Sequence, residues 1–66
     1  MQLTINGEAR ALDGLADVAA LVAHLGLDAR KVAVERNLEI VPRSAYGRTP
    51  LADGDRIEIV HFIGGG

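Results

Sequence analysis

Three consecutive glycines, Gly64 to Gly66, end the sequence and are the residues with the clearest potential for chemistry. They directly follow a strand-like run, and glycine adds no side chain to a core while losing the most backbone entropy on folding. Fully extended, three residues reach on the order of 10 Å. This length is enough to carry a terminal carboxylate into the active site of another protein. The alternative interpretation is a frayed terminus or a cloning remnant, because chain ends are commonly disordered.

Other residues suited to chemistry are few. The chain has no Cys, so it has no thiol with which to hold a persulfide, form a thioester or bind a metal. His24 and His61 have no ligand spacing to each other, and Ser44 has no assigned base. The aspartates occupy turn and cap positions, and the segment 53–55 lacks the ligand series of a calcium loop. We therefore expect no metal site, no bound cofactor and no catalytic residue in this chain.

Length and charge narrow the class of protein. The chain has 66 residues, which suits one small domain. Its 7 Lys and Arg residues are scattered, without the basic stripe typical of a nucleic-acid-binding protein. Residues 1–5 lack the pattern of a secretory signal, and the longest apolar run, 18–23, is too short to span a bilayer. We expect a cytoplasmic domain without membrane or nucleic-acid partners.

The first half of the chain predicts a hairpin and a helix. Alternating apolar residues predict strands over 2–5 and 8–12, and Asn6-Gly7 between them is the strongest short signal for a hairpin. Asp17 is a suitable N-cap for a helix over 18–25, in which apolar residues recur at helical spacing. This helix is the only one that the sequence predicts.

The second half predicts three more strands, over 32–34, 38–41 and 56–62, with a polar surface loop over 43–50. The resulting order is β-β-α-β-β-β, an α+β domain whose helix covers one face of the sheet. Residues 1–63 would form the domain, and residues 64–66 a flexible tail.

The last predicted strand places Val60 and Phe62 on the face opposite Ile57 and Ile59. If the isoleucines face the helix, Val60 and Phe62 lie outside, beside the tail, and an outward apolar pair indicates a partner surface. The candidate interface residues are Val60, Phe62, Ile63 and Tyr46. In the alternative interpretation, the loop after Arg43 folds over the pair, with Tyr46 covering Phe62.

Together, the Asn-Gly hairpin, the amphipathic helix and the last strand ending in glycines resemble the ubiquitin-like β-grasp sulfur carriers, most closely the ThiS family of thiamine biosynthesis. The most specific matches are the segments 40–43 and 51–60 and the terminal Gly65-Gly66. Leu38 departs from the family, which commonly has Gly at that place in the turn. The resemblance covers the whole chain and implies a mixed four- to five-stranded sheet packed on one main helix.

The resemblance also implies that Gly66 is the reacting residue. An E1-like, ThiF-type enzyme would use ATP and Mg²⁺ to adenylate its carboxylate, and a persulfide donor of the cysteine desulfurase system would displace AMP to leave a thiocarboxylate. A ThiG-type thiazole synthase would then use that sulfur to build the thiazole ring of thiamine. Gly64 and Gly65 would form the narrow tail. On this basis the protein is a cosubstrate of its partners and not an enzyme.

Three alternatives stay open. The small subunit of molybdopterin synthase and other thiolation carriers share the fold and the Gly-Gly end. A β-grasp interaction module with an inert tail belongs to a different class. A ubiquitin-like modifier, joined to lysines through Gly66, would use the same adenylation chemistry.

Overall fold

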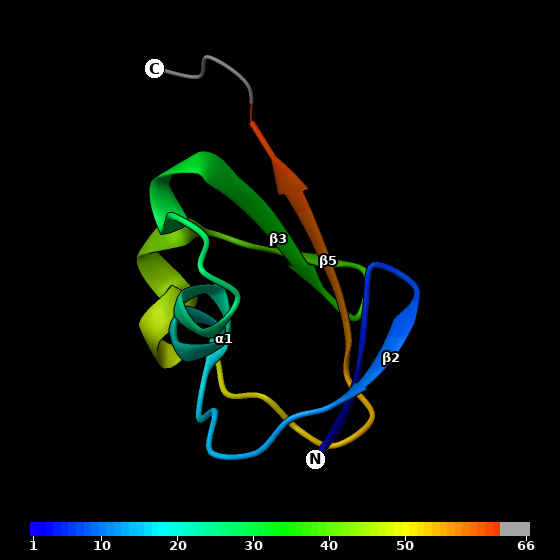
Figure 1. Cartoon of the computed structure of the whole chain (residues 1–66). Helices are drawn as coiled ribbons and strands as arrows, with labels where there is room; N and C mark the ends of the chain where they lie inside the picture. The colour runs from blue at the N-terminus through cyan, green and yellow to red at the C-terminus, as the bar shows by residue number, and fades with distance from the viewer. Residues whose placement is uncertain (63–66) are drawn as a thin grey trace.

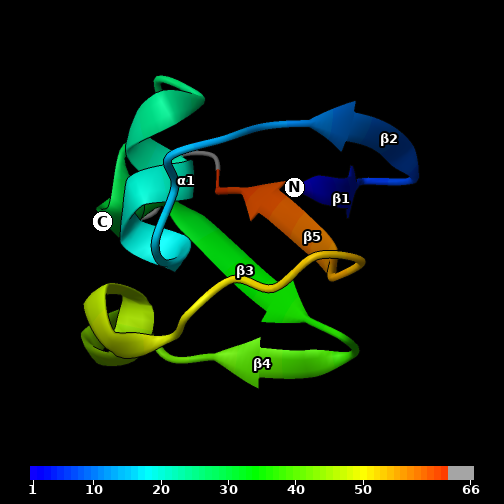
Figure 2. The same cartoon turned by 90° about the horizontal axis from the view of Figure 1, so that it is seen from below.

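The computed structural model describes residues 1–62, which form a mixed sheet with one α-helix packed on one face (Figure 1). The elements are β1 (Gln2–Ile5), β2 (Glu8–Ala11), α1 (Val18–His24), η1 (Ala29–Lys31), β3 (Val32–Arg36), β4 (Glu39–Val41), η2 (Arg43–Arg48) and β5 (Arg56–His61). Figure 2 shows the strands side by side in the order β2-β1-β5-β3-β4. The last strand is therefore the middle one. It runs parallel to β1 and antiparallel to β3.

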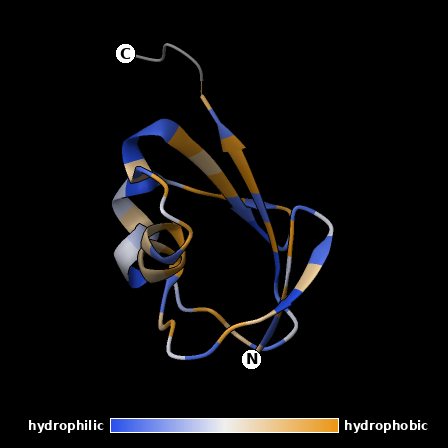
Figure 3. Ribbon diagram, viewed as in Figure 1, coloured by the Kyte–Doolittle hydropathy of each residue, from blue (hydrophilic) through white to orange (hydrophobic). Residues whose placement is uncertain are grey.

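The helix forms where the sequence predicts it, and it supplies one side of the core. Asp17 is the N-cap, and its Oδ1 accepts a hydrogen bond of 2.8 Å from the backbone N–H of Ala20. The apolar stripe of α1 packs against the inward side chains of the sheet. The buried core comprises Leu3, Ile5, Val18, Leu21, Val22, Val32, Val34, Val41, Tyr46 and Ile57. Figure 3 shows hydrophobic residues along β5 interrupted by hydrophilic ones, and the strand ends at His61.

The segment over 43–50 differs from its prediction as a surface loop. Residues Arg43–Arg48 form the 3₁₀-helix η2, which packs against α1. Its Tyr46 is 4% exposed, and the phenol O–H donates a 3.1 Å hydrogen bond to the carbonyl of Val32. The polar residues around Tyr46, together with Gly47 and Pro50, are typical of a surface loop. The structure instead buries the Tyr46 ring in the core, and this contact holds η2 against the domain. The same burial raises the pKa of Tyr46.

Both hairpins use two-residue turns in which each central residue has positive φ. Asn6 and Gly7 have φ of 49° and 80°, and Asn37 and Leu38 have φ of 52° and 70°. Positive φ at both positions is the geometry that matches the twist of two paired strands. Leu38 therefore belongs to the turn and not to the strand predicted over 38–41. A leucine with its Cβ in this region is strained by about 1–2 kcal/mol.

Replacing Leu38 by Gly is expected to stabilise the domain by about 0.5–1 kcal/mol, because glycine removes the steric strain but makes the unfolded chain more flexible. Leu38 is 75% exposed, so little packing is lost. Urea unfolding measures the change. Leu38→Ala is the matched control, since it removes the apolar side chain and keeps the Cβ. Equal stability of Leu38→Gly and Leu38→Ala would contradict the strain.

Within residues 1–62, no helix is long and apolar enough to cross a bilayer.

Candidate functional site

Four of the predicted site residues, Ile63, Gly64, Gly65 and Gly66, lie outside the described residues. The structure defines where the chain leaves the domain. β5 pairs with β3 along its length, from Ile57 opposite Arg36 to His61 opposite Val32. Just beyond the strand, the backbone N–H of Phe62 donates a 2.8 Å hydrogen bond to the carbonyl of Lys31. The chain is thus anchored to the sheet up to Phe62.

On its other side, β5 is held by a side chain as well as by a strand. The parallel pairing with β1 ends at Ile5 opposite Ile57. Beyond that pair, Asn6 of the first hairpin turn continues the ladder through its amide. Its Nδ2 donates to the carbonyl of Ile59 at 3.1 Å, and its Oδ1 accepts from the backbone N–H of Ile59 at 2.7 Å. The left-handed turn therefore also fixes the strand that leads to the predicted tail.

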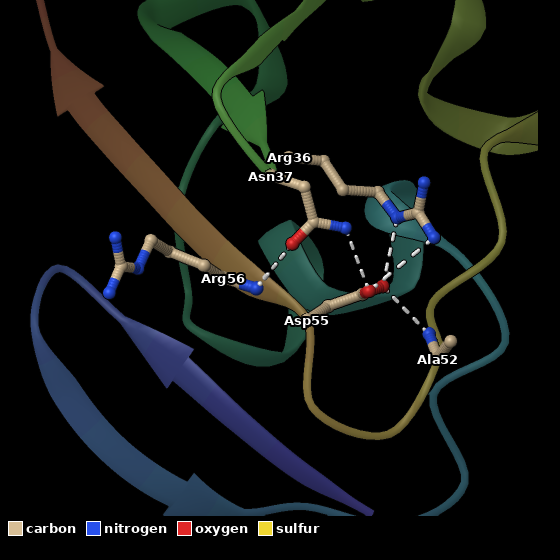
Figure 4. A network of polar contacts seen from close by, with 5 residues as sticks. All are labelled: Arg36, Asn37, Ala52, Asp55 and Arg56. Atoms are coloured by element: carbon tan, nitrogen blue, oxygen red, sulfur yellow. Dashed lines mark hydrogen bonds and ion pairs between the residues drawn. The ribbon is translucent and has the colours of Figure 1, made fainter.

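The start of β5 is fixed by a buried carboxylate (Figure 4). Asp55 is 6% exposed and accepts hydrogen bonds from Arg36 Nε at 2.8 Å, from Ala52 N at 2.8 Å and from Asn37 Nδ2 at 3.0 Å. Asn37 Oδ1 in turn accepts from the backbone N–H of Arg56 at 2.9 Å. This network joins the turn between β3 and β4 to the entry of the central strand.

The electrostatics of Asp55 follow from opposing effects. Burial raises the pKa of its carboxyl, whereas hydrogen bonds from Asn37, Ala52 and Arg36 lower it, and the pKa lies below its usual value. The sequence places Asp55 only as a turn residue. The signal that could have found its role is the pair Arg36-Asn37 at the end of β3, because both side chains carry N–H groups that need an acceptor.

Val60 and Phe62 lie on the sheet face away from α1, as predicted. Their side chains are 62% and 48% exposed, whereas Ile57 on the opposite face is fully buried. The alternative, in which the loop after Arg43 covers them, is wrong because η2 packs on the helix side. Tyr46 is buried there, so the prediction that its side chain belongs to a partner surface is also wrong. Its ring is part of the buried core between α1 and the sheet.

The two histidines are separate and exposed, His24 at the end of α1 and His61 at the end of β5. Among residues 1–62, no group of three or more His, Asp or Glu side chains is arranged to hold a metal ion.

Comparison with known proteins gives consistent matches. The sequence model of the ThiS family matches residues 3–66. The "Thiazole synthase" of Paramagnetospirillum magneticum is 59% identical over 66 residues, which is all of this chain but 20% of that protein. The "Sulfur carrier protein ThiS" of Bacillus subtilis is 50% identical over 46 residues, 70% of each protein. The chain thus spans about a fifth of the length of the thiazole synthases that it matches.

Solved structures agree with the sequence matches. The crystal structure of the thiamine biosynthesis protein (ThiS) from Geobacter metallireducens superposes with a TM-score of 0.85 at 39% identity, covering 100% of both chains. The five-stranded order and the single main helix described above are thus shared over the whole domain.

Proposed function

Because this chain belongs to the ThiS family, we propose that it is a sulfur carrier of thiamine biosynthesis whose sulfur is borne on the carboxylate of Gly66. Its fold is the ubiquitin-like β-grasp, a mixed sheet on one main helix. The match to the ThiS family over residues 3–66, which includes the three glycines, is the observation that carries the proposal. The proposal requires that Gly66 has a free carboxylate in the functional protein.

The proposed chemistry begins with adenylation. An E1-like enzyme with ATP and Mg²⁺ joins a carboxylate oxygen of Gly66 to the α-phosphorus of ATP, and pyrophosphate leaves. The acyl carbon can now be attacked by a nucleophile, because AMP is a good leaving group whereas the oxide of a free carboxylate is a very poor one. The terminal sulfur of a persulfide donor, supplied by a cysteine desulfurase, attacks this carbon and AMP departs. A second thiol then attacks the donor's own sulfur, so that a disulfide forms between the two thiol groups and the thiocarboxylate leaves on Gly66.

The chain itself contributes the carried group and its position. It has no Cys, so any sulfur that it carries is an acyl derivative. Gly64 to Gly66 have no Cβ to obstruct a narrow channel in a partner. β5 is hydrogen-bonded on both sides through Asn6 and β3, which gives the tail a fixed point of departure at Phe62. We propose that catalysis belongs to the partners and that this protein is their cosubstrate.

The proposed acceptor of the sulfur is a thiazole synthase. Support comes from the relatives named thiazole synthase, in which a segment similar to this whole chain makes up 20% of the protein. Joining a carrier and its acceptor in one polypeptide raises their effective concentration without any new contact.

The proposal is tested by the intact mass of the protein after incubation with a ThiF-type enzyme, ATP, Mg²⁺ and a persulfide donor. An increase matching one oxygen replaced by sulfur, absent when ATP is omitted, supports it. No change would contradict it. A change seen only with the activating enzyme of molybdopterin synthesis would assign the chain to that pathway, and attachment to lysines of other proteins would make it a modifier.

Phe62→Ser is expected to slow sulfur incorporation clearly while lowering the free energy of unfolding by about 1 kcal/mol or less, because the half-exposed ring lies outside the core. Thermal unfolding and the rate of the mass change measure the two effects. Leu38→Ser is the matched control, an exposed apolar residue at the far hairpin that should leave incorporation unaltered. A loss of about 3–5 kcal/mol for Phe62→Ser would show instead that Phe62 is a core residue.

A further inference from the structure

Two glutamates lie directly opposite each other in the middle of the exposed sheet face. Glu35 of β3 and Glu58 of β5 are partners in the antiparallel register. Directly opposite side chains share a face with Cβ atoms about 4.5–5.5 Å apart, and like charges in this arrangement are destabilising. Both residues are half-buried. Among residues 1–62, neither carboxylate forms an ion pair.

The nearest basic side chains on these strands are engaged or directed elsewhere. Arg36 points to the other face, where its Nε contacts Asp55 at 2.8 Å. Arg56 shares the face of Glu58, but Figure 4 shows its guanidinium directed toward β1 and β2, away from β3. Within residues 1–62, no cation is therefore paired with Glu35 or Glu58, and we expect two like charges in this arrangement to lower the stability of the free domain.

Apolar side chains surround the acidic pair. Val60 lies opposite Ala33 on the side toward Phe62, and Ile40 of β4 lies opposite Glu35 on the other side. Ile40 is 78% exposed and Val60 is 62% exposed. We call these six residues the acidic face: Ala33, Glu35, Ile40, Glu58, Val60 and Phe62. An apolar surface with two central carboxylates is complementary to an apolar protein surface that presents one arginine or lysine.

The length of the tail limits what can occupy this face. Four residues separate Phe62 from the end of Gly66, and they reach at most about 13–14 Å. An enzyme that takes the Gly66 carboxylate into its active site must therefore lie against the end of β5. Val60 and Phe62 of the acidic face are located there.

We propose that the acidic face is the docking surface for the enzyme that adenylates Gly66, and that a cationic side chain of this enzyme inserts between Glu35 and Glu58. The identity of the occupant rests on the proposed function. The repulsion between Glu35 and Glu58 then lowers the stability of the free domain. The cation of the enzyme relieves this repulsion in the complex, and this favours binding.

Charge reversal separates this role from a purely structural one. Glu58→Lys creates an ion pair with Glu35, so the melting temperature is expected to rise by roughly 2–5 °C. The same change places a cation against the cation of the enzyme, so binding is expected to weaken by about tenfold or more. Glu39→Gln is the matched control, an exposed glutamate of β4 on the opposite face, and should leave binding unaltered.

Binding is measured by calorimetry with the ThiF-type enzyme and a form of this chain that lacks Gly66, so that no chemistry is needed. The double variant Glu35→Gln/Glu58→Gln should also bind more weakly and depend less on salt than the parent. Unchanged affinity of Glu58→Lys, or no binding by the parent, would overturn the docking proposal. If Glu58→Lys bound more weakly but the full-length parent chain gained no sulfur in the mass measurement, the docking proposal would stand. The proposed function would then be overturned.

Discussion

Deletion of Gly66 is expected to abolish sulfur incorporation and to leave the thermal stability of the domain nearly unchanged. The reason is that the proposed reaction uses one particular carboxylate, at the end of three glycines, while the last backbone contact described is that of Phe62 with Lys31. The shortened chain still ends in a carboxylate, on Gly65, but that group stops about 3.3–3.6 Å short of the site. Intact mass after incubation and a thermal unfolding curve measure the two effects.

Gly66→Ala provides the control for this deletion, because it restores the length and the carboxylate and adds a single Cβ. It is expected to be modified more slowly than the parent and faster than the deletion variant, since a narrow channel would resist the methyl group. Sulfur incorporation by the deletion variant at the parental rate would show that the position of the carboxylate is unimportant. A large loss of stability would show that the tail is part of the fold.

Asp55→Asn is expected to lower the free energy of unfolding by about 2–4 kcal/mol at neutral pH. The variant places an NH₂ group among the donors from Arg36, Asn37 and Ala52, so at least one of them loses its acceptor. Because a domain of this size rarely has more than about 3–5 kcal/mol to lose, a large unfolded fraction is expected. Urea unfolding at neutral pH measures the change.

The pH dependence gives a second test of Asp55. Its pKa in the folded protein is lowered from 3.8, so the unfolded state binds more protons as the pH falls. The stabilisation is complete above the unfolded pKa and is lost as the pH falls through the folded pKa. The gap in stability between the parent and Asp55→Asn should therefore narrow below about pH 4.

Asp53→Asn is the matched control for Asp55, because it changes an exposed carboxylate of the same turn. Its Oδ1 accepts one hydrogen bond, from the backbone N–H of Gln2, and an asparagine can still accept it. It should cost little. If Asp53→Asn and Asp55→Asn had equal effects, the network at the start of β5 would not be what stabilises the domain.

The parts of the fold that depend on neighbouring residues could be predicted from the sequence. Asn6-Gly7 specifies its hairpin through two positive φ values, and Asp17 with the apolar stripe specifies α1. The outward direction of Val60 and Phe62 follows from the alternation of side chains along one strand. Each of these signals operates over a few residues, which is the range that a pattern in one sequence can report.

The parts that depend on distant residues could not be predicted in this way. Tyr46 lies in a polar segment, and only its contact with Val32 across the core shows that it is buried. Asp55 has turn residues as its neighbours, and its hydrogen bonds reach back 18 and 19 positions to Asn37 and Arg36. The opposition of Glu35 and Glu58 likewise depends on strand register, which the sequence alone left undetermined.

The most direct test of the account is the mass of the tail peptide after the reaction. Arg56 is the last Lys or Arg of the sequence, so trypsin releases the segment 57–66, which contains Gly66 and no Cys. After incubation with the adenylating enzyme, ATP, Mg²⁺ and a persulfide donor, this peptide is predicted to gain the mass of one sulfur in place of one oxygen, located by fragmentation on Gly66. An unchanged tail peptide, with the sulfur absent or found on another segment, would contradict the carrier function.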